Sequence, residues 1–173
     1  MTPPWYVLTG GPCAGKTTLV HEFERRHKNI LPEAARIFFE EQLSLGRSAD
    51  DVRAQEGWLL DIARRKYHME KAVPAEDEFF FDRGVPDSRA YYRLMHVPEE
   101  QELTDMIADS KYRKVFLLDL VDFQADAART ETPQEAARIH EAIRAVYSEL
   151  GYQLISVPVL PVPERADFIL EHL

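Results

Sequence analysis

The sequence contains a single cysteine, Cys13, among its 173 residues. One cysteine excludes an internal disulfide framework and is typical of a reducing compartment, so we expect a cytoplasmic protein. Apolar runs of about 18 residues are also missing, which predicts that no segment spans a membrane. The N-terminal residues lack the basic, apolar and small-residue pattern of a signal peptide.

Basic residues are also few, because 21 lysines and arginines stand against 30 aspartates and glutamates, for a formal net charge of -9. This balance argues against general binding of nucleic acid or of anionic membranes. An anionic ligand must then be held by local cations and not by the overall field. The length and the hydrophobic content of 45% predict one domain, residues 1–173, with a substantial core.

Residues 10–18 fit the pattern G-x-x-x-x-G-K-[ST] of the phosphate-binding loop. Glycines at both ends of the pattern let successive backbone N–H groups converge on an anion. A helix that starts near Lys16 adds the positive end of its dipole, and the Lys16 ammonium can reach the outer phosphates. The Thr17 hydroxyl is the expected protein ligand to Mg²⁺. The nucleotide-binding set is therefore Gly10, Gly11, Pro12, Cys13, Ala14, Gly15, Lys16, Thr17 and Thr18.

The flanks of this loop have the pattern that the motif requires. Residues 5–9 are a short apolar run with strand propensity, and the residues after Lys16 open a helix with Leu19, Val20 and Phe23 on one face. Cys13 has two interpretations. A helix N-terminus can lower a thiol pKa and make it oxidisable, but a small filler residue suits the position equally well without reactivity.

The rest of the chain alternates between strand and helix patterns, which predicts an α/β fold with a parallel sheet. Capping boxes at Ser48 with Asp51 and at Thr132 with Glu135 mark two helix starts. In the long helix opened at Ser48, the expected buried residues are Val52, Trp58, Leu59, Ile62 and Tyr67. Trp5, Trp58, Tyr91 and Tyr92 are interpreted as core residues. The expected strands are 29–33, 78–82, 114–119 and 152–157, and the expected helices are 34–45, 48–71, 86–95, 99–109, 132–150 and 164–173.

Acidic residues stand where two of these strands end. Asp82 follows three phenylalanines, and Asp119 ends another apolar strand. Ligands of open α/β sheets bind beyond the carboxyl ends of the strands. We therefore expect Asp82 to hold Mg²⁺, directly or through a water, with Asp119 as the rival.

Glu33 follows the second expected strand. It can accept a proton from an acceptor hydroxyl, bind that hydroxyl without chemistry, or simply match a helix dipole. Arg129, in a polar loop before the capped helix, is either a charge-stabilising arginine or a solvated one. A further set of arginines could cover a second anionic group, although most are interpreted as solvated: Arg36, Arg53, Arg64, Arg65 and Arg89.

Several segments together resemble the small AAA-domain family of P-loop ATPases and kinases. They are Gly-Gly-Pro-x-Ala-Gly-Lys-Thr-Thr at 10–18, Pro-Glu-Ala-Ala-Arg at 32–36, Phe-Phe-Asp-Arg-Gly-Val-Pro-Asp at 80–87 and Ala-Tyr-Tyr at 90–92. Further similarity at 112–116, 138–142 and 149–152 extends the resemblance over nearly the whole chain. The family is more similar to nucleoside and nucleotide kinases than to ring-forming AAA machines, and the nicotinamide riboside kinase domain is a more distant relative.

The resemblance implies a three-layer α/β/α P-loop fold with a five-stranded parallel sheet of order 2-3-1-4-5, and ATP or GTP with Mg²⁺ as cofactors. It also implies that Glu33 is the general base, that Asp82 and Arg83 form an acid–arginine pair, and that Arg129 belongs to a lid. With Lys16, these residues make the expected catalytic set. The segment around residue 125 lacks the several arginines of many kinase lids.

Two functions stay open at this point. The chain is either a kinase that transfers the γ-phosphoryl group of ATP to a nucleoside-like or other hydroxyl acceptor, or a nucleotide-dependent switch or slow NTPase with a protein or lipid partner. The sequence does not give the acceptor, the preference between ATP and GTP, or the oligomeric state.

Overall fold

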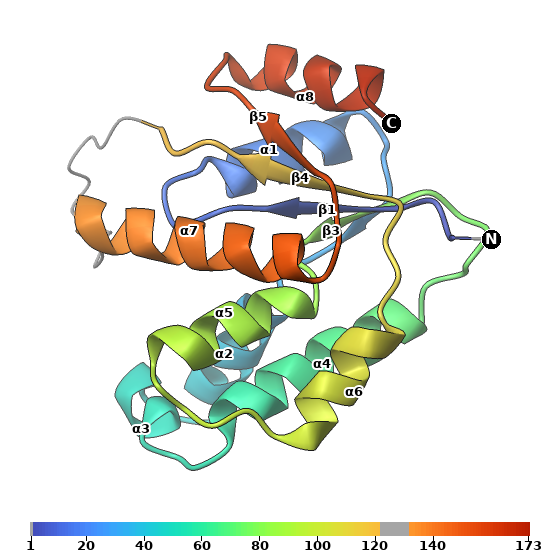
Figure 1. Cartoon of the computed structure of the whole chain (residues 1–173). Coiled ribbons are helices and arrows are strands. Elements are labelled where there is room, and N and C mark those ends of the chain that lie inside the picture. Colours follow the sequence, from blue (N-terminus) through green and yellow to red (C-terminus); the bar gives the residue numbers. More distant parts are fainter. Residues whose placement is uncertain (1, 122–131) are drawn as a thin grey trace.

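A computed structural model describes residues 2–121 and 132–173. Its centre is a five-stranded parallel sheet of order β2-β3-β1-β4-β5, as expected (Figure 1). The strands are β1 (Trp5–Thr9), β2 (Ile30–Leu31), β3 (Phe79–Asp82), β4 (Lys114–Leu118) and β5 (Leu154–Val157). β1 lies in the middle, and its five residues are all buried, which is typical of a strand covered on both faces.

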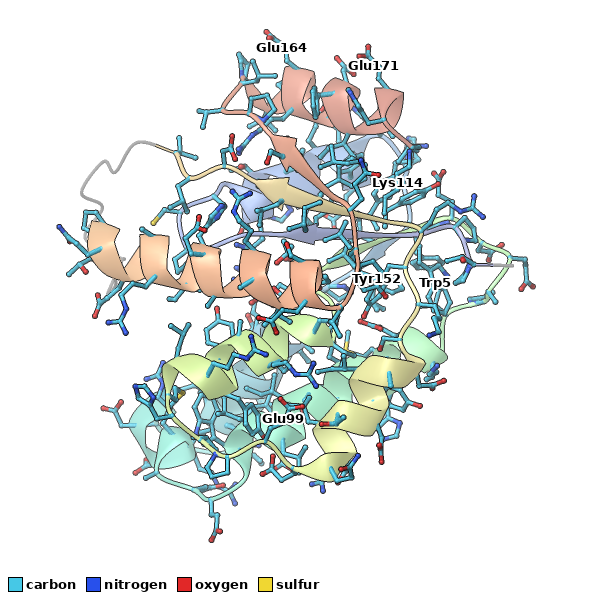
Figure 2. All side chains as sticks on the ribbon, viewed as in Figure 1. Trp5, Glu99, Lys114, Tyr152, Glu164 and Glu171 are labelled. Atoms are coloured by element: carbon cyan, nitrogen blue, oxygen red, sulfur yellow. The ribbon has the colours of Figure 1, made fainter. Side chains whose placement is uncertain are left out.

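Helices cover both faces of this sheet. α1 (Lys16–Arg25) and α8 (Val162–Glu171) pack together on one face, and α5 (Pro86–Leu94) and α7 (Pro133–Glu149) pack together on the other (Figure 1). α8 is amphipathic, because Ala166 and Ile169 are buried whereas Glu164 and Glu171 point away from the sheet (Figure 2). The result is the predicted three-layer α/β/α arrangement.

A second helical group packs beneath α5, on the side away from the sheet (Figure 1). It comprises α2 (Ala34–Ser44), α3 (Ala49–Arg53), α4 (Trp58–Lys71) and α6 (Gln101–Asp109). The buried core between this group and α5 includes Leu59 and Leu60 of α4, Leu103 of α6 and Tyr92 of α5. This group places α2 and α4 beside the carboxyl ends of β2 and β3, where ligands of such sheets bind.

The expected single helix over 48–71 is wrong, because the chain forms two helices there. α3 ends at Arg53 and α4 begins at Trp58. Gly57 precedes α4 with φ 81°, a left-handed conformation that suits glycine and interrupts a right-handed helix. The capping boxes at Ser48 and Thr132 are both confirmed.

Other boundaries differ only slightly from expectation. β2 is two residues long, and Pro32, which has no backbone N–H to donate, follows it directly. Among the described residues, no helix is both long and apolar enough to cross a membrane.

Candidate active site

The phosphate-binding loop joins β1 to α1, as the motif requires. Gly15 adopts φ 76° immediately before Lys16, the first residue of α1. A Cβ at Gly11 would lie 2.6 Å from the carbonyl oxygen of Ala136 in α7, so only glycine lets the two segments approach so closely. A pocket of about 290 Å³, here called the phosphate-loop pocket, is lined by residues 12–18 together with Glu33, Asp82 and Arg83.

Lys16 is buried beneath this loop. Its Nζ donates to the carbonyl oxygens of Gly10 at 2.9 Å and Gly11 at 2.8 Å. Burial and the nearby Arg83 guanidinium lower the pKa of Lys16 to about 7, although neighbouring carboxylates oppose the shift. An anion that binds beside a buried lysine favours its charged form and so raises its pKa again.

Asp82 ends β3 against the same pocket, and its side chain is buried. Burial and the Glu33 carboxylate raise the pKa of Asp82, against the opposing effect of nearby cations. Its Oδ1 is buried and has no hydrogen-bond partner among the described residues. A buried, unsatisfied carboxylate oxygen in a pocket that Thr17 also lines fits a divalent cation or its bound water. The expected Mg²⁺ therefore has a suitable donor set here.

Asp119, the rival acid, does not line the phosphate-loop pocket. Its backbone N–H donates to Val157 at 3.0 Å, and its carbonyl oxygen accepts from Arg165 at 2.9 Å. These backbone contacts of Asp119 connect the segment after β4 to the last residue of β5 and to Arg165 of α8. Geometry favours Asp82 over Asp119 as the acid beside a nucleotide.

Arg83 follows Asp82 and joins three groups. Its Nε donates to Glu33 Oε1 at 2.8 Å, and its Nη1 donates to Asp87 Oδ1 at 3.1 Å and to the Gly10 carbonyl oxygen at 3.2 Å. Its φ of 63° is unusual for a residue with a side chain, and such strained conformations concentrate at functional sites. The predicted acid–arginine pair, Asp82 and Arg83, therefore lies beside the phosphate-binding loop.

Glu33 occupies the N-cap position of α2, but its side chain makes no capping hydrogen bond. The carboxylate points instead to Arg83, so the contacts do not favour a role limited to the helix end. Burial alone would raise the pKa of Glu33, but Arg83 and Lys16 outweigh it and hold that pKa below its usual value. Glu33 is therefore an ionised hydrogen-bond acceptor at neutral pH.

Asp87, which the sequence reasoning did not single out, is the most connected acid of the site. It is buried and accepts hydrogen bonds from Thr9 at 2.5 Å, Tyr147 at 2.7 Å and the Gly84 N–H at 3.0 Å, besides Arg83. Its position four residues after Arg83, just inside the helix expected from residue 86, was the signal that could have indicated this ion pair.

A second pocket of about 320 Å³ adjoins the first, and we call it the apolar pocket. Glu33 and Arg83 line both pockets. Its other lining residues come mainly from α2, α4 and α5 and are mostly apolar or aromatic: Ala34, Ala35, Phe39, Arg53, Trp58, Leu59, Ile62, Lys66, Gly84, Asp87, Ser88, Tyr91 and Met95. Its volume is within the range of about 300–1,000 Å³ that is usual for small-molecule sites.

The aromatic residues of this pocket correct the sequence interpretation. Trp5 and Tyr92 are buried, as predicted for core residues. Trp58 and Tyr91 are only half-buried, because they line the apolar pocket. Of the other residues expected in the core of helix 48–71, Val52 and Leu59 are buried, whereas Ile62 and Tyr67 are half-buried.

Two buried ionisable residues of α4 were not revealed by the sequence, and one of them, Lys66, lines the apolar pocket. Lys66 donates to the carbonyl oxygen of Asp82 at 3.1 Å, and burial lowers its pKa. Glu70, one turn later, accepts from Tyr112 at 2.8 Å and from the Val85 N–H at 3.2 Å, and burial raises its pKa to about 7. Both residues connect α4 to the turn that carries Asp82 and Arg83.

Arg165, in α8, supports the loop from the other side and was also missed. Its guanidinium is buried and donates to the carbonyl oxygens of Ala14 at 2.7 Å, Asp119 at 2.9 Å, Pro158 at 2.8 Å and Val157 at 3.3 Å. One side chain thus ties the phosphate-binding loop to the ends of β4 and β5. Arg129 lies outside the described residues.

The remaining arginines of the sequence set are mostly engaged at the surface. Arg64 pairs with Glu102, Arg65 with Glu41 and Arg89 with Glu99. Arg53 lies over the Phe39 ring at 5.3 Å and pairs with exposed Asp50. Arg36 differs from these four, because its Nη2 donates to the Thr17 Oγ1 at 3.4 Å.

Solved structures with this fold include several nucleotide-binding proteins. NadR protein in complex with NR superposes with a TM-score of 0.73 at 17% identity, over 96% of this chain and 49% of the other. Thymidylate kinase from Ehrlichia chaffeensis gives 0.68 at 10% identity, over 97% of each chain. Deoxyadenosine kinase from M. mycoides gives 0.63 at 13%, over 97% of this chain and 98% of the other. This chain spans about half the length of the NadR chains.

At these identities the likeness shows the fold alone, which is the P-loop fold of nucleotide and nucleoside kinases. A model of the AAA domain family matches residues 5–165. The chain therefore belongs to that family. No curated protein sequence matches the chain.

Proposed function

We propose that this protein is a kinase that transfers the γ-phosphoryl group of ATP or GTP to a hydroxyl group of a nucleoside-like small molecule. The observation that carries the proposal is the adjacency of the two pockets, which share Glu33 and Arg83. A phosphate cradle alone serves switches and hydrolases as well. A neighbouring cavity with aromatic walls suits an organic acceptor with a flat ring.

In the proposed reaction, the bond between the γ-phosphorus and the bridging oxygen of ADP breaks, and a new bond forms to the acceptor oxygen. The loop amides and Lys16 hold the β- and γ-phosphates, and Arg83 keeps Glu33 oriented between the pockets. Glu33 hydrogen-bonds the acceptor hydroxyl and takes its proton as transfer proceeds. Thr17 and Asp82 would hold Mg²⁺, which neutralises phosphate charge when bound.

The experiment is a panel of nucleosides and other ring-bearing alcohols, incubated with Mg²⁺ and either ATP or GTP and analysed for phosphorylated product by mass spectrometry. Phosphorylation of at least one nucleoside-like compound, lost in the Glu33→Gln variant, is the expected result. Tight nucleotide binding with slow hydrolysis and no product across the panel would contradict a kinase and favour a nucleotide-dependent switch.

A further inference from the structure

We propose that Arg36 is the arginine that contacts the γ-phosphoryl group, a position that would otherwise be assigned to a lid arginine. This inference rests on the proposed nucleotide site and adds a catalytic residue from α2. Its starting point is the hydrogen bond of 3.4 Å between Arg36 Nη2 and the hydroxyl oxygen of Thr17. Thr17 follows the loop lysine, so its hydroxyl marks the side of the cradle where outer phosphates and Mg²⁺ meet.

Arg36 is also available for an anion. Within residues 2–121 and 132–173, no carboxylate forms an ion pair with it, whereas Arg64, Arg65 and Arg89 each pair with a glutamate. Its hydrogen bond to Thr17 is to a neutral hydroxyl, which a phosphate oxygen can replace with a stronger, charge-assisted bond.

The local structure delivers this side chain to the site for a physical reason. Glu33, Ala34 and Arg36 stand at the start of α2, immediately beyond the carboxyl end of β2. Glu33 lines both pockets, and the positive charge of Arg36 contributes to the lowered pKa of that carboxyl. Arg36 is exposed, so it can change rotamer at little cost when a nucleotide arrives.

A guanidinium at this place acts on the phosphoryl group in two ways. In the ground state it hydrogen-bonds γ-phosphate oxygens, which ADP lacks, so it favours ATP over ADP. In the transition state it stabilises the charge that spreads over the transferring group. Arg36 lines neither pocket, and its contact with the site is through Thr17, which lines the phosphate-loop pocket and not the apolar pocket.

The test compares ADP with a non-hydrolysable ATP analogue by calorimetry, in the presence of Mg²⁺, for the parent protein and Arg36→Met. We expect the variant to bind ADP as the parent does and to lose about tenfold or more in affinity for the analogue, as for other hydrogen bonds to charged groups. Transfer to an acceptor from the panel should fall on the order of 10²–10³ in kcat. Arg36→Lys, which keeps the charge, should lose less.

Arg47→Met is the matched control, because Arg47 is also exposed, but its side chain donates to Gln42 and not to the phosphate-binding loop. It should leave both affinities unchanged. Equal weakening of ADP and the analogue in Arg36→Met, a change confined to the acceptor KM, or a matching loss in Arg47→Met would each overturn the inference. Failure of the parent protein to bind any nucleotide would instead refute the proposed function itself.

Discussion

Arg83 donates a hydrogen bond of 2.8 Å to Glu33 at the boundary between the phosphate-loop pocket and the apolar pocket. The pair fixes a carboxylate where a nucleotide and an acceptor would meet. Because Arg83 is itself held by Asp87 and by the Gly10 carbonyl oxygen, the carboxylate cannot swing freely. This preorganisation is the main chemical feature of the site.

The first prediction concerns the Glu33 carboxylate. Glu33→Gln keeps the size of the side chain and its ability to accept from Arg83, but it removes the negative charge and the proton acceptor. Phosphoryl transfer should fall on the order of 10²–10⁴ in kcat, the usual contribution of a general base. Because the pKa of Glu33 is held low, Glu33 stays ionised as the pH is lowered. The kcat of the parent protein should therefore fall only at pH values below the usual pKa of a glutamate. A Glu33→Gln enzyme with the parent rate would show that Glu33 has no chemical role.

The second prediction follows from the pKa of Lys16, which is lowered to about 7. We therefore expect Lys16 of the free protein to be mainly neutral at about pH 8, and bound phosphates to restore its charge. Binding of Mg²⁺–ADP at that pH should therefore take up about one proton. Calorimetry in two buffers with different ionisation enthalpies measures this number directly. Lys16→Met should abolish the uptake, and proton release by the parent protein would contradict the prediction.

The third prediction separates the two strand-end acids. Asp82 lines the phosphate-loop pocket and has an unsatisfied Oδ1, whereas Asp119 does not line it. Asp82→Asn should reduce the Mg²⁺-dependent gain in nucleotide affinity about 10- to 100-fold. Asp119→Asn should leave that gain intact. The assignment is wrong if only Asp119→Asn removes it.

The fourth prediction concerns stability. Arg165→Met removes a donor from four carbonyl oxygens, those of Ala14, Asp119, Pro158 and Val157, although the last still accepts from the Asp119 N–H. A buried unsatisfied group costs about 1–3 kcal/mol, so we expect the free energy of unfolding to fall by about 3 kcal/mol or more. Arg64→Met removes an exposed ion pair with Glu102 and should cost less than about 1 kcal/mol. Urea denaturation of both variants tests this, and equal losses would argue against an anchoring role for Arg165.

Local patterns predicted the elements of this fold well, because their signals lie within a few residues. The loop at 10–18, the strand ending at Asp82 and the capped helix after Thr132 are all where the sequence indicated. The strand order came from the resemblance and is confirmed. The prediction of one helix over 48–71 is wrong because a glycine inside a helical pattern can either be tolerated or interrupt the helix, and Gly57, with φ 81°, interrupts it.

Residues that depend on long-range contacts could not be predicted. Lys66 resembles any surface lysine on an amphipathic helix, and only the approach of α4 to β3 buries it against Asp82. Arg165 is likewise separated by about 150 positions from the loop that it supports. Trp58 is a large apolar residue in a helical pattern, so the sequence predicts a core position. Its place in the wall of the apolar pocket depends on how α2, α4 and α5 pack together.

The central claim is that the loop amides and Lys16 hold the polyphosphate of a nucleotide, beside Asp82. Calorimetric titration of the parent protein and Lys16→Ala with Mg²⁺–ATP and Mg²⁺–GTP tests it most directly. The account predicts that at least one nucleotide binds the parent and that Lys16→Ala binds it at least about tenfold more weakly, because a buried charge-assisted contact is lost. No binding of either nucleotide, or a Lys16→Ala variant with the affinity of the parent, would contradict it.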